Sequence, residues 1–145
     1  MTDKTEQTKT PLLIKSQYIK DLSLEIPYAP EIFKEIKSQP ELKLDVSIES
    51  KKIDDDYNVT LNLSINSDLN DRKLFVLELS YAALVSVNVP AEHLEPVCLV
   101  EVPRLLFPFA RNIITQCLAE GGLPPLMLAP IDFATLYLAR KAGKQ

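Results

Sequence analysis

The chain has 145 residues, 46% of them apolar and 25% charged, which is enough for one globular domain that folds without disulfides or metal. Its 16 basic and 20 acidic residues give a net charge of −4, which argues against nucleic-acid binding, because phosphate contacts need clustered Lys and Arg. No apolar run approaches the ~20 residues of a membrane span, so we expect no membrane insertion.

The polar N-terminus lacks the apolar stretch of a secretory signal peptide, which predicts a cytoplasmic protein. We expect residues 1–11 to form a disordered tail, 12–142 a single domain and 143–145 a short C-terminal tail. Cys98 and Cys117 lie in apolar runs without a Cys or His at ligand spacing. Two buried free thiols are therefore favoured over a disulfide.

Strict alternation of apolar and polar residues over 41–49 and 57–66 predicts two strands, joined by a loop at 51–56. A less regular pattern over 13–26 predicts an earlier strand. After a loop at 67–72, residues 74–89 predict a long strand, apolar on both faces, with a bulge or bend near Ala82–Ala83. One buried and one wet face per strand indicates an antiparallel sheet.

The period becomes helical after Pro90, with a broad apolar stripe over residues 104–120. Because proline suits only the first turn of a helix, Pro108 predicts a start near Leu105–Phe107, and Gly121–Gly122 predicts the end. A last helix is expected from the N-cap Asp132 to about Ala142. Four strands followed by two helices predict an α+β fold, with both helices packed on one side of the sheet.

Signals for catalysis are absent from the sequence. His93 is the one histidine, and no Ser, Cys or Lys has a recognisable activating base. Asp54, Asp55 and Asp56 read as a solvated hairpin tip, because a calcium loop needs spaced ligands and a closing Glu. We therefore predict no enzyme activity, no metal and no cofactor.

Apolar residues occur where connectors are normally polar, over residues 28–40 and in the three-proline segment 123–130. Either these connectors pack on the sheet and close the core, or they wall a hydrophobic groove whose flexible side chains suit varied ligands. Under the second interpretation the groove residues are Tyr28, Phe33, Leu123, Leu126, Met127, Phe133, Leu136 and Tyr137.

Two motifs give the chain a resemblance to the SecB family of export chaperones. Residues 21–30 (DLSLEIPYAP), with 39–44 (QPELKL), resemble the family's opening segment. Residues 106–111 (LFPFAR) and 122–133 (GLPPLMLAPIDF) resemble its helical part more strongly. The order and spacing agree from about Leu12 to Arg140.

The resemblance implies a homotetramer, assembled as a dimer of dimers, that holds unfolded secretory precursors without ATP and delivers them to the SecA motor. It implies an acidic sheet face for SecA's zinc-bearing C-terminal tail, with the zinc belonging to SecA. The matching positions here are Asp21, Ser23, Glu25 and Glu78. It also implies that Leu77, Leu79 and Tyr81 support subunit assembly, although a purely internal core role is an open alternative.

The sequence departs from the family pattern in several places. Ala82–Ala83 replaces a glycine pair, Ile36 lies near the place of a tryptophan, and Val102-Pro103 replaces Cys-Pro. The C-terminal end is basic rather than acidic, which puts some SecA contacts in doubt. Two other functions stay open: a SecB-like chaperone dedicated to an antitoxin, and a small protein that binds hydrophobic ligands.

Overall fold

The computed structural model describes residues 10–143. Most of the predicted N-terminal tail, residues 1–9, and the last two residues of the predicted C-terminal tail lie outside that range. Within it, a four-stranded antiparallel sheet has the order β1-β4-β3-β2. The strands are β1 Leu12–Glu25, β2 Glu41–Ile53, β3 Asp56–Leu69 and β4 Arg72–Val87, with a 3-10 turn, η1 Glu31–Glu35, between β1 and β2.

Both hairpin loops are shorter than predicted. Ile53 pairs with Asp56, and Leu69 pairs with Arg72, so each turn has only two residues between paired strand ends. Asp54 has φ 56°, while Asn70 and Asp71 have φ 52° and 64°. Asn and Asp tolerate this left-handed backbone better than most residues, so the strands can continue to the tip.

The bulge predicted at Ala82–Ala83 is wrong. Pairing of β4 runs unbroken through both alanines on either side, and the irregularities near them lie in β1, between Ile14 and Ser16 and between Ile19 and Asp21. A bulge in an interior strand disturbs two hydrogen-bond ladders, whereas one in an edge strand disturbs only one. Two of the sheet's register shifts therefore lie in the edge strand β1, and a third lies in β4 at Leu74, beyond the residues of β4 that pair with β1.

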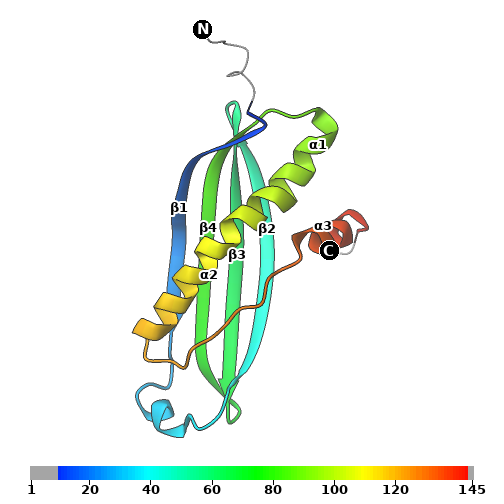
Figure 1. Cartoon of the computed structure of the whole chain (residues 1–145). Coiled ribbons are helices and arrows are strands. Elements are labelled where there is room, and N and C mark those ends of the chain that lie inside the picture. The colour runs from blue at the N-terminus through cyan, green and yellow to red at the C-terminus, as the bar shows by residue number, and fades with distance from the viewer. Residues whose placement is uncertain (1–9, 144–145) are drawn as a thin grey trace.

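The long helix begins earlier than Pro108 suggested. A helical run of α1 Ala91–Pro96, a π-helical turn η2 Val97–Glu101 and α2 Val102–Glu120 crosses the sheet diagonally (Figure 1). Pro108 lies in the interior of α2 and is exposed, as is Arg104, the residue four positions earlier whose carbonyl loses its bond. Water can satisfy that carbonyl, which explains why the helix tolerates this proline.

The predicted helix ends are confirmed. Gly122 has φ 75°, and the Leu123 amide donates to the Leu118 carbonyl at 3.0 Å, a closing bond that needs a left-handed residue, for which glycine is favoured. The final helix is α3 Phe133–Lys141. Its first turn is capped by Asp132, whose Oδ1 accepts from the Thr135 amide at 3.0 Å.

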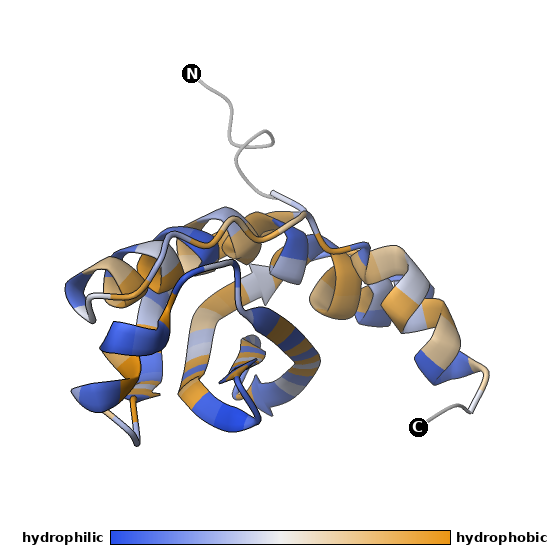
Figure 2. Cartoon of the chain, turned by 90° about the horizontal axis from the view of Figure 1, so that it is seen from below, coloured by the Kyte–Doolittle hydropathy of each residue, from blue (hydrophilic) through white to orange (hydrophobic). Residues whose placement is uncertain are grey.

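The core lies between α2 and one face of β3 and β4. The α2 row of Leu106, Ala110, Ile114 and Leu118 is buried, and so are the facing strand residues. We call residues 28–40 the first connector and residues 123–130 the second connector. Seen end-on, the helices and the second connector lie on one side of a curled sheet, and α3 extends beyond the edge of that sheet (Figure 2). The prediction of two helices over one face thus describes α2 well, whereas α3 lies beside the edge strand β2 (Figure 1).

Adjacent leucines of α2 test this packing. Leu106 is 0% exposed and Leu105 is 46% exposed. Leu106→Ala should lower the free energy of unfolding by about 2–5 kcal/mol, because it leaves a cavity, and Leu105→Ala should cost clearly less. Chemical denaturation measures both. An equal loss for the two variants would contradict this placement of α2.

Candidate functional site

Strand β2 carries an apolar strip that the helices do not cover completely. On β3 the residues of the same sheet face, including Leu61 and Leu63, are 0–1% exposed. On β2 the strip is half-buried or exposed, and Leu42 is 42% exposed. We call Leu42, Leu44, Val46 and Ile48 the β2 strip. It offers apolar surface along β2, which is an edge strand of the sheet formed by residues 10–143.

A hollow of about 360 Å³ lies between the β2 strip and α3. Leu136 and Tyr137, both predicted groove residues, line it from α3. Val46 and Ile48 of the strip line the opposite wall, and Leu99 of η2 also lines it. These last three were not predicted, because their alternation or helical period gives only the buried face of an element. It does not give the identity of the element that covers that face.

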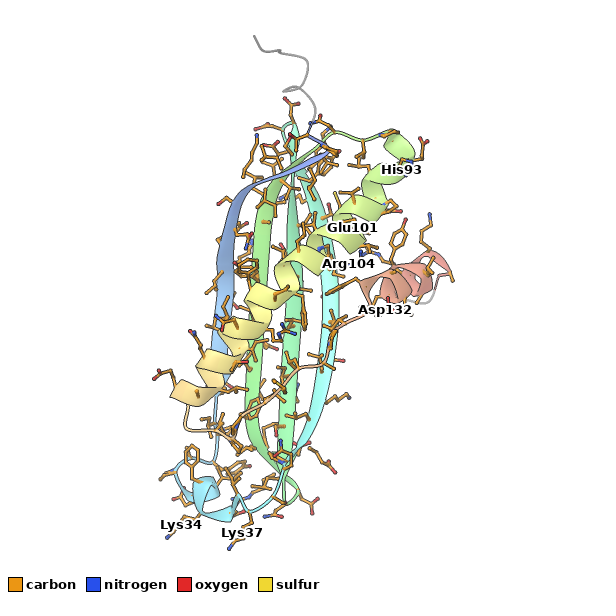
Figure 3. The ribbon with its side chains drawn as sticks, viewed as in Figure 1. Lys34, Lys37, His93, Glu101, Arg104 and Asp132 are labelled. Carbon is orange, nitrogen blue, oxygen red and sulfur yellow. The ribbon has the colours of Figure 1, made fainter. Side chains whose placement is uncertain are left out.

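Polar contacts fix α3 beside this hollow. Arg140 donates from Nη1 to the Ile48 carbonyl at 3.2 Å, and the Tyr137 hydroxyl donates to Oε1 of Glu95 at 2.9 Å. Burial, followed by the bond to Glu95, raises the pKa of Tyr137. Asp132 caps the helix start and lies near Arg104 of α2 (Figure 3). The α3 wall is thus attached to both β2 and α1.

The other predicted groove residues divide into exposed and buried ones. Met127 is 89% exposed, and Tyr28 and Phe33 are also exposed, while Leu126 is half-buried. Leu123 and Phe133 are buried, and the Phe133 ring packs edge-on against Phe107 with centroids 6.1 Å apart. Some connector side chains therefore close the core and others are exposed, and the binding role of the exposed ones stays a prediction.

The opposite face of the sheet is polar and acidic. Asp21, Ser23, Glu25 and Glu78 are all exposed. Ser23 pairs in register with Glu78, so the four positions lie together on neighbouring strands β1 and β4. We call these four residues the acidic face.

A hollow of about 270 Å³ continues the acidic face across the sheet. Asp21 and Glu78 line it, and so does Asp45 from β2, at the other edge. Ser80 donates to Oδ1 of Asn62 at 2.6 Å across its floor. Asp45 was missed as a member of this surface because strand order, not sequence spacing, brings it there. Its position on the wet face of an alternating strand was the available signal.

The three residues predicted to support assembly are buried within this chain. Leu77 and Leu79 are 0–1% exposed, and Tyr81, at 8%, accepts a hydrogen bond from Gln17 Nε2 at 3.0 Å through its hydroxyl oxygen. They lie on the face that α2 covers. Any effect of these side chains on a neighbouring subunit must therefore pass through the elements packed on them.

The remaining chemistry is sparse. Cys98 and Cys117 are free, as predicted, and burial raises the pKa of both thiols. Within residues 10–143 no cluster of three or more His, Cys, Asp or Glu is placed to hold a metal ion. None of the helices in the described part of the chain is both long and apolar enough to span a bilayer.

The architecture defines the class of protein by its likeness to a solved structure. A SecB-like chaperone of Mycobacterium tuberculosis, solved in complex with a ChAD peptide from the HigA1 antitoxin, matches with a TM-score of 0.68. The match covers 83% of this chain and 91% of that one at 14% sequence identity. The likeness at this identity establishes a SecB-like fold.

The family follows from sequence similarity. The family model of preprotein translocase subunit SecB matches residues 5–144. The chain is 44% identical to the protein-export protein SecB of Rhodospirillum rubrum, over 94% of this chain and 86% of that protein. It is 48% identical to that of Paramagnetospirillum magneticum, over 90% and 86%. The chain belongs to the SecB family.

The cap of α3 should respond to pH. Hydrogen bonds from Thr135 lower the pKa of Asp132, so the cap's contribution to stability is complete above the ordinary Asp pKa. It should be lost as pH falls through the lower folded value. The Thr135 amide proton, followed by NMR, should titrate there in the wild type and not in Asp132→Asn. Titration at or above the ordinary Asp pKa would contradict this cap.

Proposed function

We propose that this SecB chaperone of protein export holds unfolded secretory precursors in the cytoplasm, without ATP, and delivers them to the SecA motor. The observation that carries the holding role is apolar surface left open next to the core: the β2 strip, the hollow beside α3 and the exposed connector residue Met127. We call this combined surface, with Tyr28 and Phe33, the client groove. It suits extended, apolar segments of varied sequence.

Holding follows from mass action, because a protein that binds only the unfolded state lowers the folded population of its client. A client side chain that becomes fully buried contributes ~1.5–3 kcal/mol. Ordering about ten client residues costs ~10 kcal/mol or more. A single groove therefore binds weakly, and several grooves engaging one long client would raise its avidity by roughly 10²–10⁴.

This arithmetic supports the proposed homotetramer, a dimer of dimers. Two apolar surfaces are available for it. Strand β1 is an edge strand with exposed Ile19 and Leu22, and the outer side of α2 exposes Leu105 and Phe109. An unpaired edge strand is a ready template for pairing with another chain. The two surfaces would depend indirectly on the buried residues Leu77, Leu79 and Tyr81. These side chains would support subunit assembly by packing against the elements that carry the surfaces.

SecA would bind on the acidic face. Asp21, Glu25 and Glu78 supply negative charge around Ser23, and we add Asp45 because it lines the same hollow. Such a face suits a positively charged partner segment, and we assign that role to the zinc-bearing tail of SecA. It lies on the side of the sheet opposite the client groove, so client and SecA can bind at the same time.

The export role has the support of the curated relatives, whose names describe protein export. The antitoxin-bound neighbour shares the fold alone and carries no argument for an antitoxin-dedicated role. A discrete small ligand is less well supported, because the exposed apolar residues extend along a strand and a connector instead of surrounding one cavity.

Two exposed groove residues test client binding. The double variant Met127→Asp, Leu136→Asp should weaken capture of a reduced, alkylated precursor tenfold or more, by roughly one buried side chain's worth of free energy. Its thermal stability should change little, because both side chains are exposed. Calorimetry gives the affinity. Ile53→Asp is the matched control: Ile53 is 40% exposed, but it lies at the far end of β2 from the first connector. Equal precursor affinities for the wild type, the double variant and the control would refute the groove.

The acidic face is tested separately. Asp21→Lys with Glu78→Lys should weaken binding of a zinc-loaded SecA tail peptide about tenfold, by turning attraction into repulsion. Client affinity should stay unchanged. Asp55→Lys, at the β2–β3 turn, changes charge away from this face and should leave both affinities as they are. Fluorescence anisotropy at low and moderate salt measures the effect. Unaltered tail binding by the double variant would exclude this surface.

A further inference from the structure

One arginine attaches the first connector to the sheet. Arg72 is the first residue of β4, and its Nη2 forms an ion pair and hydrogen bond with Oε2 of Glu35, the last residue of η1. Its Cζ also lies 4.8 Å from the centroid of the Tyr28 ring, which precedes η1. A single guanidinium therefore contacts the connector before the 3-10 turn, at Tyr28, and at the last residue of the turn, Glu35.

The β3–β4 turn adds a second donor to the same carboxylate. Asn70, which adopts a left-handed backbone with φ 52°, places its Nδ2 3.4 Å from Oε1 of Glu35. Both carboxylate oxygens thus accept from one turn. The bond from Arg72, with that from Asn70, lowers the pKa of Glu35, and the same bond raises the pKa of Arg72.

Apart from these contacts, the connector is held by local backbone bonds and by Ile32 and the half-buried Ile36, which pack in the core. Its backbone bonds are local, from the Ile32 amide to the Tyr28 carbonyl at 3.0 Å and from the Phe33 amide to the Pro30 carbonyl at 3.1 Å. Ile32 is the one residue of η1 that is buried. Phe33 packs beside the end of α2, where a Cβ built on Gly122 would lie 3.8 Å from Cε1 of its ring. The position of the Phe33 ring beside α2 thus depends on how firmly the first connector is held.

We propose that Arg72 is a positioning residue of the client groove: by clamping Tyr28 and Glu35 to the β3–β4 turn, it keeps the connector that carries Phe33 against the end of α2. This inference rests on the proposed function, because it assigns the clamped connector to the client groove. Arginine suits the role, since its planar fork bonds a carboxylate while its face stacks on an aromatic ring.

The test compares Arg72→Gln, which removes the charge, and Arg72→Lys, which keeps the charge but loses the fork. Lys37→Gln is the matched control: it removes a positive charge near the same connector, and Lys37 points away from the sheet (Figure 3). Within residues 10–143 no ion pair is found for Lys37. Hydrogen exchange at the Ile32 and Phe33 amides reports the clamp, and the affinity for a reduced, alkylated precursor reports the groove.

We expect Arg72→Gln to speed exchange at both amides by about threefold to thirtyfold, the combined effect of losing a surface ion pair and an exposed cation–π contact. Client affinity should fall by about threefold to tenfold, because only one wall is loosened. In both measurements, the exchange rate and the client affinity, Arg72→Lys should give values between those of Arg72→Gln and the wild type. Lys37→Gln should stay within about twofold of the wild type in both measurements, as expected for a solvated charge.

The outcomes separate the two proposals. Unchanged amide exchange in Arg72→Gln overturns the clamp. Faster exchange with full client affinity overturns the positioning role, because the connector would then move without affecting the groove. A wild-type chain that does not bind the precursor overturns the proposed function itself, and the positioning role with it.

Discussion

The structure depends on a mismatch in width between one helix and the sheet it covers. A helix with its side chains is about 10–12 Å across. Each strand of a sheet occupies a width of about 4.8 Å, so four strands form a sheet about 19 Å wide. The helix α2 seals the apolar face of the middle strands β3 and β4. The same face of β2 stays half-exposed. Apolar surface that would otherwise stabilise the fold is therefore left available to a partner.

The two-residue period of the strands separates this apolar surface from the acidic one. Alternate residues of β2 point to opposite sides of the sheet, so Val46 faces the hollow beside α3 while Asp45 faces the acidic hollow. On β4, Leu77 and Leu79 are buried beneath α2 while Glu78 between them is exposed. One sheet can therefore present two surfaces of opposite chemistry without further elements.

The connectors complete the apolar surface, and each is held by a few specific contacts. The second connector is fixed at one end by buried Leu123 and at the other by buried Phe133, and Met127 between them is exposed. The first is fixed by buried Ile32 and by Arg72. In each connector some apolar side chains pack on the core, such as Leu123 and Ile32, and others are exposed, such as Met127 and Phe33.

The sequence by itself determined the strands, the glycine end of α2, the cap of α3 and the two polarities of the sheet, because each follows from local backbone preference or from a short period. It misplaced the start of the long helix, since whether water can reach the carbonyl freed by Pro108 depends on which side of α2 is exposed. It also placed a bulge at Ala82–Ala83, whereas the register shifts near those residues lie in β1, because the position of a strand within a sheet is not a local property.

Only the tertiary structure decided which apolar residues are consumed by the core. Leu123 and Phe133 looked no different in sequence from Met127 and Leu136, yet the first two are buried and the others are exposed. Asp45 and Arg72 acquired their neighbours through strand order and turn geometry. Burial and long-range pairing depend on what covers each position, and a one-dimensional pattern records only which residues need to be covered.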